Sequence, residues 1–391
     1  MMREWILFFM LSALASGQDA RTWSIGIPRP DPIAYHRPHL VAGPTQDVNQ
    51  LIRENAVSGK LLVVGISGKH TESLRLFKKY GSYTQDYGDL VLQLIGMDAG
   101  AEIRGIHIYA DIGKVKSAEF HNLRISTSHG ARSPILDIGR PDRLVFNGLT
   151  LLPDPDNLTD FGGAGMKWGF DLGDGSDYLH INNCKRGHGQ RFEEHWAYLK
   201  STGKLYISNN DIGGGNRTGF QVRTPGEKDP PHGHMVVANN YAKDFGWDWG
   251  FSNGGSCITI WESLEWPVYI VNNTVINSKY GCLAIAHTAP QDVEPHLLPS
   301  GRAHSRVLLM GNRFTNPNGD RSCVSINSTE IVSIVSGKFD GGIRPDILID
   351  SKTAWKWGAP SCMRSFLSST LWSLDIQHWD GVKYVPIEIR R

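Results

Sequence analysis

Several polar side chains in the middle of the chain stand at alternate positions of short apolar segments, and their types could carry out acid–base chemistry on a charged substrate. They are Asp171, Tyr198, Lys200, Gln221, Arg223 and Trp261. A lysine or an arginine can neutralise a carboxylate by charge. Lysine, arginine, histidine and tyrosine can also move a proton when their pKa is tuned to the task. These residue types therefore fit proton abstraction beside a carboxylate.

Segments rich in histidine, tryptophan and acidic residues border the same apolar segments. Their candidate residues are His232, His234, Trp247, Asp248, Trp249, Glu262 and His287. The tryptophan rings could stack on sugars or pack within a loop. A uronate lyase would use Lys200 and Arg223 on the carboxylate and the proton, assisted by Tyr198 or a histidine. A glycoside hydrolase needs two carboxyl groups across the bond, here Asp171 with Glu262 or Asp248. The residues permit both reactions, and the two cations are equally typical of an ordinary solvated surface.

Two kinds of strand alternate along the chain and would position these residues. One kind, such as Leu136–Gly139, Phe170–Gly173 and Phe220–Arg223, has apolar first and third positions, which is typical of a strand with one buried face. This alignment puts Asp137 level with Asp171. The other kind ends two residues after an apolar residue, at Asn122, Gly148, Asn183, Asn209, Asn239, Asn273, Asn312 and Ser336. A β-propeller is excluded because each blade needs about 40 residues, and these repeats are too short and uneven. A β-sandwich is excluded because it would not repeat the same asparagine bend in every unit. The pattern therefore predicts an all-β solenoid, a parallel β-helix.

With this register, the chain from Leu61 to Asp350 resembles the right-handed parallel β-helix proteins of the pectate-lyase-like superfamily, which are secreted polysaccharide lyases and glycosidases. The resemblance implies that the asparagines form a ladder at a tight bend between two sheets, since left-handed backbone suits Asn. It also implies that the Phe220-type strands form the first sheet, whose face carries the active cleft between long loops. No Arg-x-Pro-x-x-Arg motif and no Asp-Asp pair occurs, so the hydrolase-like Gly187-His-Gly189 is a chance match.

The first 17 residues and the overall composition indicate an exported protein with no nucleic-acid partner. Residues 1–17 combine a basic start, a short apolar run and small residues, as in a cleavable signal peptide. No later segment reaches membrane-spanning length. The 391 residues carry a formal net charge of +1, whereas a nucleic-acid binder needs a basic surface. We therefore expect a secreted, periplasmic or cell-surface protein, with no membrane contact after cleavage.

Residues 18–60 and 351–391 are expected to cover the two ends of the β-helix. The first stretch is Pro-rich and then predicts an amphipathic helix from Thr45 to Val57, with Thr45 or Asp47 as its cap. Such covers are needed because the end of a sheet stack exposes unpaired backbone groups. The last stretch loses the strand register and would form a C-terminal cap.

The cysteines and the oxygen-rich segments give no sign of a bound cofactor. The five cysteines lack a Cys-x-x-Cys spacing, so a zinc site is not expected. Cys257, Cys282 and Cys323 precede three successive Phe220-type strands and are predicted to stack, as free thiols or with a Cys257–Cys282 disulfide. The segment Asn316–Asp320 offers oxygen ligands for calcium but lacks a flanking acidic set, and it is typical of a turn.

Together the residues predict a secreted single-domain enzyme that acts on an extracellular polysaccharide. The leading hypothesis is a lyase that cleaves an acidic, uronate-containing glycan by β-elimination, with Lys200 and Arg223 acting on the carboxylate and the proton. A glycoside hydrolase is the alternative among enzymes. A non-catalytic glycan-binding or adhesion β-helix is the alternative from another class. The sequence leaves the polymer, the bond and the oligomeric state open.

Overall fold

The structure is a computed structural model, and it describes residues 26–77, 79–80, 83–84, 89–109, 115–126, 135–137, 141–152, 166–172, 176–186, 192–200, 203–215, 218–223, 233–245, 256–261, 266–286, 306–316, 319, 321–326, 331–349, 363–366, 375–380 and 382–387. In these ranges almost all regular elements are β-strands, and the one helix is α2 (Val48–Asn55). No helix in the described ranges is long and apolar enough to cross a membrane.

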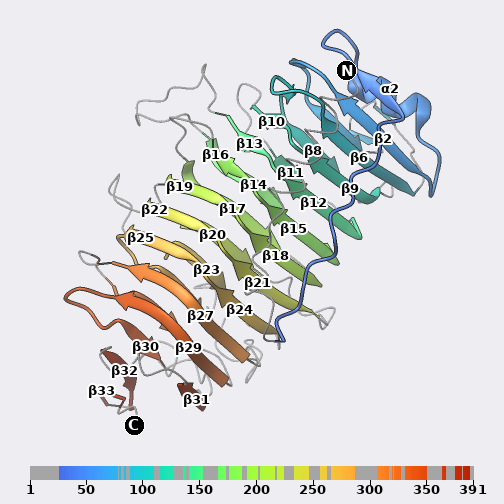
Figure 1. Ribbon diagram of the computed structural model, residues 1–391. Helices are drawn as coiled ribbons and strands as arrows, with labels where there is room; N and C mark the ends of the chain where they lie inside the picture. Colours follow the sequence, from blue (N-terminus) through green and yellow to red (C-terminus); the bar gives the residue numbers. More distant parts are fainter. Residues whose placement is uncertain are drawn as a thin grey trace, which may run out of the picture.

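The strands form two long parallel ladders that run along a common axis (Figure 1). Sheet A contains β1 (Leu40–Ala42), β2 (Leu61–Ile66), β6 (Leu90–Gly96), β7 (Glu102–Ile103), β9 (Val115–His121), β10 (Arg124–Ile125), β12 (Arg143–Asn147), β13 (Thr150–Leu151), β15 (Tyr178–Asn182), β16 (Lys185–Arg186), β18 (Lys204–Ser208), β19 (Asp211–Gly215), β21 (His234–Ala238), β22 (Tyr241–Phe245), β24 (Pro267–Val271), β25 (Thr274–Ser278), β27 (Arg306–Thr315), β29 (Ile331–Asp340) and β31 (Met363–Phe366). Sheet B contains β3 (Leu74–Phe77), β8 (Ile106–Tyr109), β11 (Ile135–Asp137), β14 (Met166–Leu172), β17 (Phe192–Lys200), β20 (Thr218–Arg223), β23 (Ile258–Trp261), β26 (Leu283–Ala286), β28 (Val324–Ile326), β30 (Ile347–Ile349), β32 (Ile376–Trp379) and β33 (Tyr384–Pro386).

Each coil of the chain passes through sheet A, bends, and returns through sheet B. In one coil β15 leads through a bend to β16 in the same sheet and then to β17 in sheet B. Each strand pairs in parallel with the strand of the next coil, as β15 does with β18 and β17 with β20. This topology confirms the predicted all-β parallel β-helix. A separate short hairpin joins β4 (Lys79–Tyr80) to β5 (Tyr83–Thr84).

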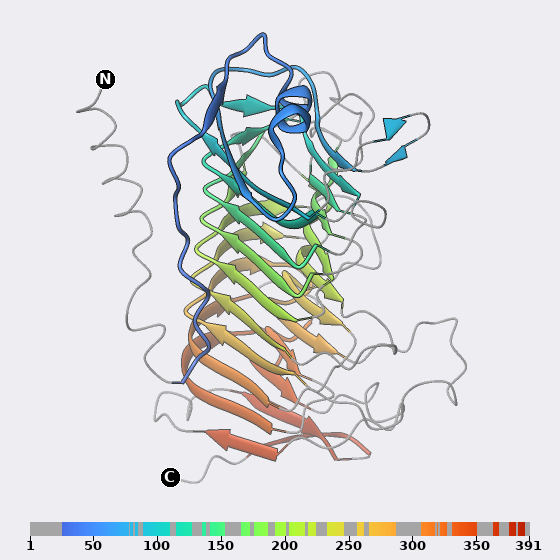
Figure 2. The same ribbon diagram turned by 90° about the vertical axis from the view of Figure 1, so that its right-hand side faces the viewer.

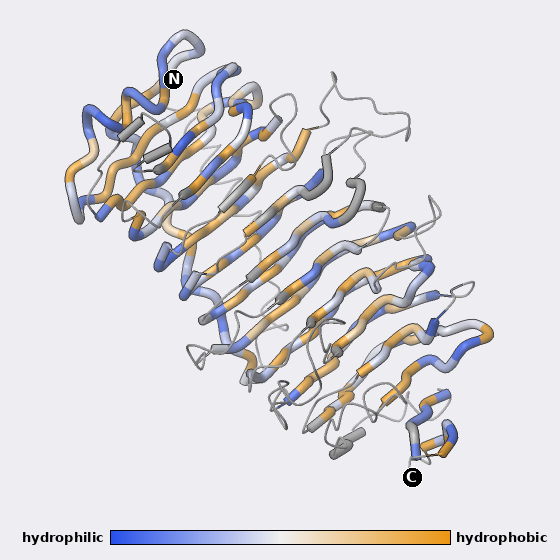
Figure 3. The backbone as a smooth tube through the Cα atoms, turned by 180° about the vertical axis from the view of Figure 1, so that it is seen from behind, coloured by the Kyte–Doolittle hydropathy of each residue, from blue (hydrophilic) through white to orange (hydrophobic). Residues whose placement is uncertain are grey.

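The core lies between the sheets and is filled by side chains that stack from coil to coil. An aromatic series runs through its first half with ring centroids 4.9 to 5.4 Å apart, from Phe120 and Phe146 through Phe170 and Trp196 to Phe220. These residues are fully buried. Figure 3 shows apolar colour following the strand segments and polar colour gathering at many of the bends. Alternation along the strands therefore places the apolar side chains inside, as the sequence predicted.

The bend after the long strands of sheet A requires left-handed backbone. The residues with positive φ there are Asn122, Gly148, Asn183, Asn209, Asn239, Asn272 and Gly311. The predicted bend at Asn273 is wrong by one residue, because Ile270 rather than Val271 aligns with the core residue Val237. Val271 instead joins a second apolar cluster outside the core. The sequence of β24 is thus apolar on both faces, which hides its register.

Asn273 and Asn312, predicted at the bend, belong to a second and buried asparagine ladder. It runs along the axis through Asn210, Asn240, Asn273 and Asn312. Each amide Nδ2 donates to the Oδ1 of the next amide over 2.8 to 3.1 Å. Each Oδ1 also accepts from the backbone N–H of the preceding ladder residue. The ladder therefore satisfies polar groups inside the core and ties neighbouring coils in one register.

The cysteine stack in sheet B is confirmed as free thiols. Cys257, Cys282 and Cys323 are buried and unpaired, and the Sγ atoms of Cys282 and Cys323 lie 3.5 Å apart. Each cysteine precedes a core residue of its strand, as Cys282 precedes Leu283. The thiols therefore act as small apolar core groups.

Helix α2 lies beside the first coils, and an extended segment runs down the flank of the stack. Asp47 caps α2, since its Oδ1 accepts from the backbone N–H groups of Asn49 and Gln50 at 2.8 and 3.2 Å. Val48 and Ile52 are the buried side chains of this helix. Residues 26–39, here called the strap, cross the long strands of sheet A along the axis (Figure 2). At the other end, β31 and β32 extend both ladders, and β33 pairs antiparallel with β32.

We predict that Asn240→Leu lowers the free energy of unfolding by about 3 kcal/mol, because it leaves buried amide and carbonyl groups without partners. The matched control is Asn183→Gly, at an exposed bend position with φ 51° where glycine is tolerated. Thermal unfolding of both variants provides the measurement. Equal losses of stability in the two variants would contradict the role of the buried ladder.

Candidate functional site

The strands of sheet B carry the predicted polar residues in two rows of register positions. Asp171, Tyr198, Gln221 and Thr259 are register partners on β14, β17, β20 and β23. In the neighbouring row Lys200 pairs with Arg223, and Arg223 pairs with Trp261. Adjacent strands lie about 4.8 Å apart. The backbone therefore brings the predicted residues of four coils together in the arrangement that the alternation indicated.

One part of the predicted register is wrong. Asp137 was expected level with Asp171, but Leu136 pairs with Asp171 and Asp137 pairs with Leu172. Leu172 is buried in the core, so Asp137 does not belong to the outer row. The cause is a run of two adjacent apolar residues, Ile135 and Leu136, either of which could have been the inward one.

The side chains described on this face are shielded from solvent. Gln221 is 7% exposed and Thr259 is 2% exposed, while Tyr198 is half-buried. Thr259 Oγ1 donates to the carbonyl oxygen of Ser256 at 2.7 Å. Outward polar residues of a sheet are ordinarily solvated. The low exposure of these two side chains therefore distinguishes this part of the face from a bare solvated surface.

His195 lies beside Tyr198, a position on this face that strand alternation does not predict. The ring centroids of His195 and Tyr198 are 6.0 Å apart, and His195 is only 3% exposed. Trp196 and Ala197 are both buried in the core, so the alternation of β17 breaks between them. This break brings His195 to the side of Tyr198. Counting alternate positions back from Tyr198 misses it, and only the bulky apolar Trp196 signals the irregularity.

The remaining predicted residues fall in connections that start or end at these strands. His232, Trp247, Asp248, Trp249, Glu262 and His287 lie outside the described residues. The connections that contain His232, Glu262 and His287 leave the last residues of β20, β23 and β26, which are neighbours in sheet B. Three consecutive insertions therefore follow the carboxyl ends of three neighbouring strands, next to the row of Lys200 and Arg223.

His234 does not belong to this face. It was predicted in the loop after β20, but it is the first residue of β21 in sheet A. Its Nε2 lies 2.6 Å from the hydroxyl oxygen of Tyr206, which in turn donates to the carbonyl oxygen of Arg29 in the strap. Burial and the charge of Lys204 lower the pKa of His234 to about 4. His234 is thus part of the contact with the strap.

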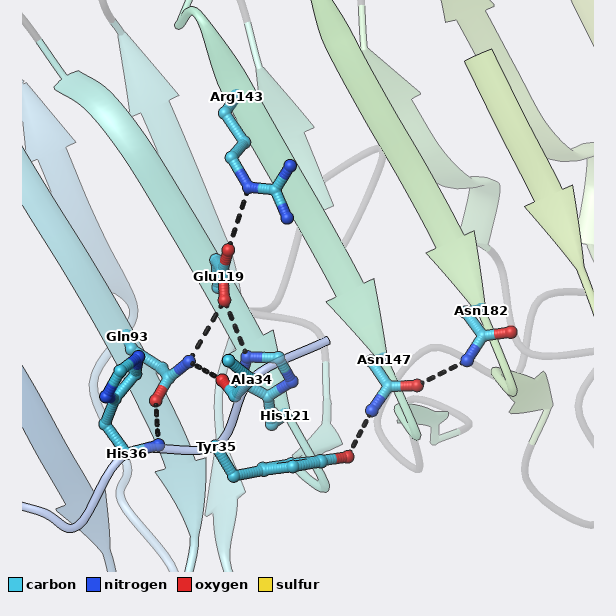
Figure 4. A network of polar contacts seen from close by, with 9 residues as sticks. All are labelled: Ala34, Tyr35, His36, Gln93, Glu119, His121, Arg143, Asn147 and Asn182. Atoms are coloured by element: carbon cyan, nitrogen blue, oxygen red, sulfur yellow. Dashed lines mark hydrogen bonds and ion pairs between the residues drawn. The ribbon is translucent and has the colours of Figure 1, made fainter. Parts of the chain in front are cut away.

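A second polar cluster, which the sequence analysis did not predict, fixes the strap to sheet A (Figure 4). Gln93 of β6 accepts from the backbone N–H of His36 at 2.9 Å and donates to the carbonyl oxygen of Ala34 at 2.7 Å. The hydroxyl of Tyr35 is hydrogen-bonded to Asn147 of β12. The Tyr35 ring also packs on His121, with centroids 5.0 Å apart. The strap is therefore held by both its backbone and its side chains.

Glu119 is the charged centre of this cluster. Its carboxylate lies 2.9 Å from Arg143 Nε, 3.3 Å from His121 Nε2 and 3.0 Å from Gln93 Nε2. Burial alone would raise the pKa of Glu119, but these hydrogen bonds and the charge of His121 outweigh it and lower the pKa to about 2. Arg143 also pairs with Asp31 of the strap at 2.7 Å. One cation thus joins the strap to the sheet.

Tyrosine and histidine side chains extend the contact along the next strands. The Tyr178 hydroxyl accepts from the backbone N–H of Asp31 at 3.0 Å, and burial raises the pKa of Tyr178 to about 12. His180 is fully buried, with Nε2 3.0 Å from Ser208 Oγ, and burial lowers its pKa to about 3. Perturbed pKa values often mark catalytic sites. Here the charged groups are paired and the strap covers them, so the cluster is a structural clamp.

Metal binding has no clear place in the described part of the chain. No three His, Cys, Asp or Glu side chains gather there closely enough to hold a metal ion. At the segment considered for calcium, the backbone N–H of Gly319 donates to the carbonyl oxygen of Asn316 at 3.1 Å. Asn316 Nδ2 donates to the carbonyl oxygen of Arg321 at 2.9 Å. These bonds are those of a local turn.

We predict that Glu119→Gln destabilises the protein by about 3 kcal/mol, because Arg143 and His121 lose the carboxylate that compensates them in a largely buried cluster. Asp244→Asn is the matched control, since Asp244 pairs with Lys243 over 3.8 Å where both side chains are about half exposed. That exposed pair contributes little. Chemical denaturation measures both variants. A loss from Glu119→Gln no larger than the control would show that the clamp does not stabilise the fold.

We predict that stability falls when the pH drops from neutrality towards 4. His234 and His180 have lowered pKa values, so the neutral forms favour the fold above pH 6.5, and this contribution is lost progressively as the pH falls from 6.5 to their folded values. His234→Gln keeps a donor for Tyr206 and cannot be protonated. The thermal midpoint of His234→Gln should therefore fall less between pH 7 and pH 5 than that of the unchanged protein. Parallel curves for the two proteins would refute this assignment.

Comparison with known proteins adds no family to this geometry. The chain matches no protein-family model, no curated protein and no solved structure. The functional argument therefore uses the residues of this chain alone.

Proposed function

We propose that this protein is a secreted polysaccharide lyase that cleaves a uronate-containing glycan by β-elimination on the outer face of sheet B. The observation that carries the proposal is the register of Lys200 with Arg223, next to Trp261 and beside the row of Asp171, Tyr198 and Gln221. Two cations on adjacent strands repel each other unless an anion lies between them. A polymer with a carboxylate on each sugar supplies that anion.

The long axis of the β-helix suits an extended polymer. Solenoids present elongated surfaces along the stacking direction, and the two rows on sheet B follow that direction over four coils. The low exposure of Gln221 and Thr259 supports a covered surface rather than a solvated one. Three connections follow the carboxyl ends of β20, β23 and β26, next to the row of Lys200 and Arg223. Connections on rigid scaffolds often carry binding residues. Trp261 at the end of that row is a residue type that stacks on sugar rings.

The reaction divides into tasks that these residue types can perform. A cation, Lys200 or Arg223, pairs with the uronate carboxylate and thereby acidifies the hydrogen on the adjacent carbon. A base, the other of the two or a histidine, takes that proton as the electron pair forms a carbon–carbon double bond. The bond to the glycosidic oxygen breaks, and an acid such as Tyr198 protonates the leaving oxygen. Export places the enzyme with its polymer, as the pattern of residues 1–17 indicates.

We predict that Lys200→Met and Arg223→Met each lower the rate of product formation at least roughly 100-fold, because each removes a charge that acts on the carboxylate or the proton. Lys204→Met is the matched control, since Lys204 is exposed and belongs to sheet A. The measurement is ultraviolet absorbance of the unsaturated sugar released from a uronate polymer.

Three other results would each replace the proposal with a defined alternative. New reducing ends without ultraviolet absorbance would indicate a hydrolase. Polymer binding without cleavage would indicate a glycan-binding or adhesion β-helix. Full turnover by both Lys200→Met and Arg223→Met would move the site away from this face.

A further inference from the structure

Between β15 and β18 the strap advances along sheet A by two residues. Asp31 contacts Tyr178 on β15, and Arg29 contacts Tyr206 on β18. Ile27, two residues earlier, is 4% exposed and belongs to the apolar cluster that contains Val236 of β21. Two extended residues span up to about 6.6 Å, which is enough to cover one strand spacing of about 4.8 Å. The described part of the strap begins at Gly26, and in Figure 1 the free end of this blue segment lies near β24.

The outer face of sheet A stays apolar beyond the point where the described strap ends. Tyr269 of β24 and Leu308 of β27 are the register partners that follow Val236 in its row. Met310 of β27 lies in the adjacent row, and Val335 of β29 follows further along the axis. All four belong to the cluster of Ile27, and Tyr269, Leu308 and Val335 are only partly buried. This apolar strip therefore continues the surface of sheet A that the strap covers.

The sequence at and before the start of the strap has apolar side chains that could cover this strip. Trp23, Ile25 and Ile27 are apolar and alternate with polar residues or glycine. Their spacing of two residues equals the advance of the strap between β15 and β18. The same advance beyond Ile27 would carry Ile25 and then Trp23 over the strands that follow β21.

We propose that residues 21–25 extend the strap and dock on the apolar strip formed by Tyr269, Leu308, Met310 and Val335. The occupant is this chain's own N-terminal segment, because the strip is continuous with the established strap contact and the chain leaves that contact at its edge. Docking removes apolar surface from water, and surface of this kind otherwise promotes association between chains. The strap and its extension then seal sheet A from the first coils to β27, while the proposed substrate face lies on sheet B.

A photo-crosslink in the full chain tests the proposal directly. Trp23 is replaced by benzoylphenylalanine, the protein is irradiated, and the crosslinked peptides are identified by mass spectrometry. The proposal predicts intramolecular crosslinks to the peptides that contain Tyr269, Leu308 or Met310. Crosslinks to a second copy of the chain would assign the strip to an oligomer interface and overturn the proposal. Crosslinks elsewhere, or none, would overturn it as well.

Limited proteolysis gives an independent readout on the unchanged chain. Arg21 is followed by Thr22, whereas Arg29 and Arg37 of the strap are followed by proline and resist trypsin. Docking should make cleavage after Arg21 at least roughly tenfold slower than in a free peptide of residues 18–28. Leu308→Asp should restore fast cleavage, while the control Tyr241→Asp, at a 41% exposed tyrosine of β22, should not. Cleavage of the unchanged chain at the rate of the free peptide would refute the docking even if Leu308→Asp fails to fold.

Discussion

Hydrogen bonds between buried asparagine amides set the register on which the rest of this molecule depends. Each amide in the ladder from Asn210 to Asn312 bonds the next amide and a backbone group, so a coil that slipped by one residue would bury unpaired polar groups. Such a penalty is large beside the small net stability of a protein. The left-handed bends next to the ladder then fix where each chain turns. With that register, side chains far apart in sequence meet in rows on the outer faces.

The two outer faces use those rows differently. On sheet A the polar residues pair with one another and with the strap, so Glu119 and Arg143 compensate each other's charge and need no ligand. On sheet B the register puts Lys200 level with Arg223, and an anionic polymer is the ligand proposed for these two residues. This contrast supports placing the proposed chemistry on sheet B. The pKa values on sheet A follow from burial beneath the strap, which is a structural cause.

The sequence predicts the fold well wherever only one face of a strand is apolar. The register of β17, β20 and β23 was predictable because the outward positions that were aligned are polar, apart from Trp261. It failed at β24, where Val271 is apolar yet points outside the core, and at β11, where Ile135 and Leu136 are adjacent. At β24 alternation cannot distinguish burial in the core from burial in the second apolar cluster. At β11 either of the two adjacent apolar residues could have been the inward one.

The candidate site was predictable in its sheet rows and not in its surroundings. Tyr198, Lys200, Gln221 and Arg223 followed from strand alternation, but His195 required the break beside Trp196. The clamp escaped prediction because its partners are distant in sequence, with Asp31 and Arg143 separated by 112 residues. The assignment of His234 failed because the point where a connection rejoins sheet A has no sequence signal. Long-range pairing of this kind follows from the coil register and not from local pattern.

The most direct test of the proposed function compares one uronate polymer with the same polymer after its carboxyl groups have been reduced to alcohols. The proposal requires the carboxylate both to bind the cationic row and to acidify the adjacent carbon. We expect ultraviolet-absorbing product from the native polymer and none from the reduced polymer. Equal cleavage of the two polymers would contradict the role assigned to Lys200 and Arg223, and with it the proposed β-elimination.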